Sequence, residues 1–75
     1  METKALPPHR AQILADLRAD AAALRNRVAT ARANNETRCR PPWGDARMYS
    51  LAELESMADG FEADAANCER EWAAE

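Results

Sequence analysis

The side chains able to do covalent or acid–base chemistry are few in this sequence, and they are scattered. His9 is the single histidine. Cys39 lies between Arg38 and Arg40, whose positive charges favour the reactive thiolate form of a cysteine, although we expect an inert loop thiol. Cys68 falls at a predicted core position, where it acts as a small hydrophobe. Nucleophilic catalysis needs a serine or cysteine held beside a base, and we interpret neither cysteine as such a nucleophile, so we predict a protein that is not an enzyme.

Metal and cofactor sites are not predicted either. The two cysteines are too few and too far apart for a disulfide framework or a zinc site, and we expect both to be reduced. The carboxylates that could pair for acid–base work or hold a metal are Glu53, Glu55, Asp59, Glu62, Asp64, Glu69 and Glu71. Such sites also use histidines and an enclosed pocket, which nothing here supports. We interpret these carboxylates as a solvated helix face, the alternative being a negative surface that docks on a basic partner or imitates nucleic acid.

One segment combines the residue types that dominate binding hot spots. Residues 38–47 read RCRPPWGDAR, and tryptophan and arginine are the residues most enriched in such hot spots. An aromatic ring among arginines can also stack on nucleic-acid bases while the arginines hold phosphates. The structural alternative is that Trp43 folds onto the end of the neighbouring helices, with the arginines solvated around it.

Two helices must position these residues. Neither glycine nor proline interrupts the stretch from His9 to Ala33, in which alanine, leucine and arginine dominate. We predict a helix over about residues 9–33, ended by Asn34 and Asn35, which favour turns.

The second helix is predicted over about residues 50–74. Ser50 followed three positions later by Glu53 forms a capping box in front of an apolar run. Gly60 costs about 1 kcal/mol relative to alanine inside a helix, but it falls on the outer face, so we expect the helix to run through it. Residues 34–49 then form a long loop.

Apolar side chains recur in steps of three and four along both helices, which is the seam of a heptad repeat. The seam residues are Leu14, Leu17, Ala21, Leu24, Val28 and Ala31 in the first helix, and Leu51, Leu54, Ala58, Phe61, Ala65, Cys68 and Trp72 in the second. The predicted fold is therefore an all-α antiparallel two-helix hairpin that resembles a coiled coil, in a single domain over residues 1–75. In the register we predict, large residues meet small ones in nearly every layer, as close packing needs.

Charge supports the antiparallel arrangement. Residues 1–47 carry nine basic and five acidic side chains, and residues 48–75 carry one basic and eight acidic, so the two parts have charges of about +4 and −7. The positions beside the seam hold Arg18, Arg25 and Arg32 in the first helix and Glu55, Glu62 and Glu69 in the second. An antiparallel hairpin sets these columns face to face, which selects orientation more than it stabilises. The same register brings Asp20 toward Asp64 on the other edge.

A two-helix hairpin leaves one side of its apolar seam in water. Ile13, Met57 and Trp72 lie on or beside that side. We favour covering by a second hairpin in a four-helix-bundle homodimer, because a 75-residue chain with few large core residues usually recruits a partner. The alternative is that the loop folds back as a lid through Trp43 and Tyr49.

These patterns favour a small protein-binding module, an adaptor or inhibitor that engages a larger partner through an acidic face of the second helix and the arginine and tryptophan loop. The predicted partner-binding residues are Arg38, Arg40, Trp43, Arg47, Tyr49, Glu53, Asp59, Glu62 and Glu69. The alternative is a nucleic-acid-binding regulator that uses the arginines, which fails if glutamates occupy Arg18, Arg25 and Arg32. We expect a cytoplasmic protein, because no targeting or membrane segment is apparent. Size and composition associate it with bacterial or phage accessory proteins, including inhibitors of host defence.

Overall fold

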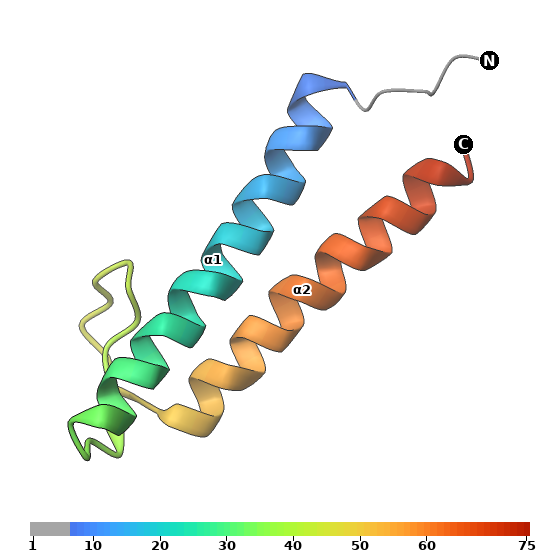
Figure 1. Cartoon of the computed structure of the whole chain (residues 1–75). Coiled ribbons are helices and arrows are strands. Elements are labelled where there is room, and N and C mark those ends of the chain that lie inside the picture. The colour runs from blue at the N-terminus through green and yellow to red at the C-terminus, as the bar shows by residue number, and fades with distance from the viewer. Residues whose placement is uncertain (1–6) are drawn as a thin grey trace.

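A computed structural model describes residues 7–75, which form two long antiparallel helices. Helix α1 spans Pro8–Ala33 and helix α2 spans Leu51–Ala73, and they lie side by side along nearly their whole length (Figure 1). The predicted hairpin is confirmed, and the helix ends lie within one residue of those predicted. Residues 1–6 of the predicted domain lie outside the described residues.

Local sequence signals set the ends of both helices. Helix α1 begins with Pro8 at its first position, where the missing amide hydrogen removes no helical bond. It ends in a Schellman motif: Asn35 adopts φ 59°, and the Glu36 amide donates to the Ala31 carbonyl at 2.8 Å. Helix α2 begins with the predicted capping box at Ser50. It continues through Gly60, as expected.

The core lies between the helices and is closed at the loop end. Its largest fully buried side chains are Leu24, Leu54 and Cys39. The buried residues are Leu14, Ala21, Leu24, Val28, Ala31, Cys39, Leu54, Ala58 and Ala65. Most of them are alanine or other small residues, which lets the two backbones approach each other closely.

The predicted charge columns face each other along one edge of the hairpin. Arg18 pairs with Glu69, and Arg32 pairs with Glu55. Between them, Arg25 reaches Glu62 and Asp59 at 3.0 and 2.8 Å. Successive pairs are seven residues apart on both helices, which confirms the antiparallel orientation and the predicted facing of the two charge columns. We call this edge the ladder edge.

The connection between the helices is more ordered than a simple loop. Two-residue strands, β1 (Arg38–Cys39) and β2 (Tyr49–Ser50), pair antiparallel with Cys39 opposite Tyr49. Cys39 is buried in the core, whereas Cys68 is only half-buried. Cys39 therefore takes the core position expected of Cys68, and Cys68 is less buried than expected. Alternation along β1 turns Cys39 inward between its two arginines, which helical periodicity could not indicate.

The connection covers only part of the edge opposite the ladder, which we call the loop edge. This edge carries Ile13, Asp20 and Arg27 from α1 and Met57, Asp64 and Glu71 from α2, by their places in the heptad. The loop stands beside the C-terminal half of α1 (Figure 1). Cys39 belongs to the core cluster and Tyr49 packs against it, so the connection covers this part of the seam, which we call the closed half.

The remaining part of the loop edge, which we call the open half, has no such cover from residues 7–75. Leu17, Phe61 and Cys68 are half-buried, although they occupy the same heptad position as Leu24 and Leu54, which are fully buried. Ile13 is 44% exposed. Phe61 meets the Trp43 ring of the loop, so it lies at the boundary between the two halves.

The two free helix ends are joined by contacts of Arg10. Its guanidinium group binds both carboxylate oxygens of Glu75, at 2.6 and 3.0 Å, and lies 4.9 Å from the centre of the Trp72 ring. The hydrogen bond to Glu75 raises the pKa of Arg10 above its ordinary value. Neither α1 nor α2 is long and apolar enough to cross a membrane.

Candidate functional site

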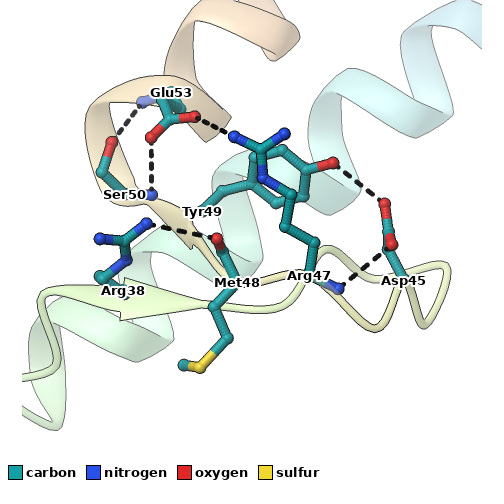
Figure 2. Close-up of polar contacts among 7 residues, drawn as sticks. All are labelled: Arg38, Asp45, Arg47, Met48, Tyr49, Ser50 and Glu53. Carbon is teal, nitrogen blue, oxygen red and sulfur yellow. Dashed lines mark hydrogen bonds and ion pairs between the residues drawn. The ribbon is translucent and has the colours of Figure 1, made fainter.

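A network of polar contacts fixes the shape of the loop (Figure 2). Asp45 accepts hydrogen bonds from the Arg47 amide at 3.2 Å and from the Tyr49 hydroxyl at 3.0 Å. The Arg47 guanidinium lies over the Tyr49 ring, 4.8 Å from its centre, and 3.9 Å from a carboxylate oxygen of Glu53. Glu53 also belongs to the capping box with Ser50. The loop is therefore tied to the first turn of α2.

Hydrogen bonds of this network shift the pKa values of three groups. The hydrogen bond from the Arg47 amide, followed by that from Tyr49, lowers the pKa of Asp45 below its ordinary value of 3.8. The bond to the Ser50 amide lowers the pKa of Glu53 below 4.5. The bond to Asp45 raises the pKa of Tyr49 above 10.0. The folded loop thus favours ionised carboxylates and a neutral phenol.

The outward face of the strand pair is basic and apolar. Arg38, Arg40 and Met48 are exposed, while Cys39 and Pro41 between and beside them are buried. The Met48 side chain points away from the Tyr49 ring (Figure 2) and is 46% exposed. Arg38 donates to the Met48 carbonyl at 3.5 Å. No side chain among residues 7–75 pairs with that of Arg40.

Trp43 lies at the tip of the loop and beside the open half. Its ring meets Phe61 edge to face, with the ring centres 6.2 Å apart, yet it remains 51% exposed. A turn holds it there: the Gly44 amide donates to the Pro41 carbonyl at 3.1 Å, and Gly44 has φ 81°, which glycine tolerates best. The Trp43 ring therefore packs against Phe61 while about half of its surface stays exposed to solvent.

We call Arg38, Arg40, Trp43 and Met48 the loop surface. Of the predicted residues, the structure joins Arg47 to Tyr49 and to Glu53, while no hydrogen bond, ion pair or ring contact within residues 7–75 joins Arg38, Arg40 or Trp43 to any of the others. Tyr49 and Glu53 are engaged in holding the loop. Asp59, Glu62 and Glu69 belong to the ladder edge and are paired with arginines of α1. Binding by the predicted residues stays a prediction.

Sequence reasoning missed Met48. A signal was available, because Cys39 and Tyr49 alternate with Arg38, Arg40 and Met48 as inward and outward residues do on strands. Segments of two residues are too short for that alternation to be distinguished from an irregular loop.

Groups of three or more metal-ligand side chains that could hold an ion do not occur among residues 7–75. Comparison of the chain with known protein families, curated proteins and solved structures found no match.

The pKa shifts predict a pH window for the loop. A carboxylate whose folded pKa is lowered contributes stability that is lost as pH falls through that pKa. For Asp45 and Glu53 this occurs below their ordinary values of 3.8 and 4.5. For Tyr49, with a raised pKa, the contribution is lost as pH rises above 10.0. We expect Trp43 fluorescence, measured in a Trp72→Phe background, to shift at both limits and stay constant between them.

Two substitutions serve as controls for this titration. Tyr49→Phe should remove the alkaline shift, because no phenolic proton remains to be lost from the ring. Asp45→Asn should reduce the acid shift. Equal acid and alkaline shifts in wild type and variants would show that the loop network does not control Trp43.

Proposed function

We propose that this chain is a protein-binding module without catalytic activity, an adaptor or inhibitor that engages a larger partner through the loop surface. The observation that carries the proposal is the exposure of Trp43 and Met48, 51% and 46%, on a loop that is fixed by internal contacts and also carries the exposed Arg40. Exposed large apolar side chains that gather beside arginines are typical of binding hot spots.

The fixed loop favours binding because it reduces the entropy lost when a partner docks. Strand pairing, the burial of Cys39 and the contacts of Asp45 with Tyr49 all hold the loop before any partner arrives. Trp43 presents one open side in a defined position. A partner then needs a pocket for the indole ring and the Met48 side chain.

The charges favour a protein over nucleic acid as the partner. Arg18, Arg25 and Arg32 are paired within the ladder edge, so they contribute little to a phosphate-binding surface. The loop arginines remain, but they belong to a chain with a net charge of −3, and general nucleic-acid affinity usually accompanies a strongly basic surface. The same ladder pairs occupy Asp59, Glu62 and Glu69, so the loop surface carries more of the proposal than the acidic helix face does.

We place this activity in the cytoplasm. Cys39 and Cys68 are both free thiols, which suits a reducing compartment. A role as a bacterial or phage accessory protein, such as an inhibitor of host defence, is proposed from size and composition alone.

The test is capture of partners from native lysate on immobilised wild-type chain and on Trp43→Ala. We expect a retained protein to be lost with Trp43→Ala and with Arg40→Glu. Trp72→Ala is the matched control, because it removes the other tryptophan from the far end of the hairpin. Circular dichroism must show the same helix content in all variants.

The outcomes separate the two classes of partner. A retained protein that survives Trp43→Ala and Arg40→Glu contradicts the proposal. Retention of nucleic acid, with an affinity that falls steeply as salt is added, favours the regulator instead. A band lost equally with Trp72→Ala would indicate a general loss of structure.

A further inference from the structure

The loop edge of the hairpin has two halves of opposite character. In the closed half the loop projects from the helices (Figure 1), and it carries the exposed Arg40 and Arg47. In the open half the seam carries the half-buried side chains of Leu17, Phe61 and Cys68. Trp43, which touches Phe61, marks the boundary between the halves.

The charges of the two halves are complementary. Asp20, Asp64 and Glu71 occupy loop-edge positions in the open half, and no side chain among residues 7–75 pairs with them. Their heptad positions place Asp20 and Asp64 on the same edge of the seam, so two like charges border the same apolar strip. At the loop, no side chain among residues 7–75 pairs with that of Arg40, and Asp45, five residues further along the chain, is bonded to Tyr49. Each half therefore lacks the charge that the other half carries.

We propose that a second copy of the chain covers this edge, with the loop of each copy seated on the open half of the other. A two-fold axis near Trp43 makes both contacts at once, because a two-fold interface must be complementary to itself. The loop of each copy then covers the half-buried apolar side chains of the other. Arg40 comes to the unpaired Asp20 and Asp64 of the other copy, while Trp43 and Ile13 leave water.

This arrangement has a consequence for partner binding. The second copy covers Trp43 and Arg40, so the dimer and the complex with another protein exclude each other. The dimer does not depend on the proposed function, because it follows from the complementarity of one edge with itself. Capture experiments should accordingly use the immobilised chain at low density.

Sedimentation velocity of the full chain at low ionic strength tests the proposal. We expect a dimer that dissociates on dilution and on addition of salt. Arg40→Glu sets like charges against the acidic half, and the double variant Asp20→Arg with Asp64→Arg sets like charges against the loop. Each should raise the dimer dissociation constant by about tenfold or more. Arg70→Glu, on the outer face of α2, makes the same change of net charge as Arg40→Glu and should leave the constant unaltered.

The decisive measurement mixes the two variants. In the mixed dimer both contacts regain opposite charges, because arginines at 20 and 64 meet glutamate at 40, and the unaltered acids meet Arg40. We expect mixing to restore a dimer that neither variant forms alone. A wild-type chain that stays monomeric at roughly millimolar concentration, or a mixture that stays monomeric, overturns the proposal. A dimer unaffected by either variant places the contact on another face and overturns it also. None of these outcomes bears on capture of a partner by Trp43, which fails or succeeds separately.

Discussion

Replacement of Leu24 by alanine is expected to lower the free energy of unfolding by about 2 to 5 kcal/mol. Leu24 is 0% exposed and belongs to the cluster that includes Leu54, Val28 and Cys39. The substitution removes apolar contacts and leaves a cavity that rigid neighbouring helices only partly fill. A chain of 75 residues has a total stability of roughly 4 to 11 kcal/mol, so the substitution should remove a large part of it.

Leu17→Ala provides a matched control. Leu17 occupies the same heptad position one repeat earlier in α1, but it is only half-buried. Its replacement should cost clearly less than that of Leu24. Urea denaturation followed by circular dichroism would measure both, at a concentration where the chain is monomeric. Equal losses for Leu17→Ala and Leu24→Ala would contradict the asymmetry between the closed and open halves.

The hairpin could be predicted from the sequence because its signals are local or periodic. The capping box at Ser50 and the turn-forming Asn35 act within one helical turn. The charge columns repeat every seven residues, so the ion pair of Arg25 with Glu62 follows once the chain doubles back. The local signals mark where each helix begins and ends, and the repeat indicates which sides of the two helices face each other.

The connection could not be predicted in the same way. The inward direction of Cys39 depends on a pairing with Tyr49 across nine intervening residues, and strands of two residues leave no usable alternation. The contact of Trp43 with Phe61 joins loop to helix without any repeat. Tertiary contacts, rather than local preference, therefore decide the site.

Reversal of the basic column is expected to have the second large effect. A variant with Arg18→Glu, Arg25→Glu and Arg32→Glu would set three glutamates against Glu55, Glu62 and Glu69. Each exposed pair alone contributes little, but three like-charge contacts along one edge oppose the antiparallel approach of the helices. We expect the melting temperature to fall by roughly 10 °C at low ionic strength, and to recover partly at high salt, which screens exposed charges.

A second triple reversal separates the ladder from the effect of net charge. Adding Glu55→Arg, Glu62→Arg and Glu69→Arg rebuilds all three pairs with inverted polarity, and should restore the melting temperature. Adding arginines instead at Glu36, Asp64 and Glu71 gives the same net charge but no facing pairs, and should restore little. If the two sets of reversals restore stability equally, the pairs have no positional role. The seam of alternating large and small residues would then set the orientation of the hairpin without help from the charges.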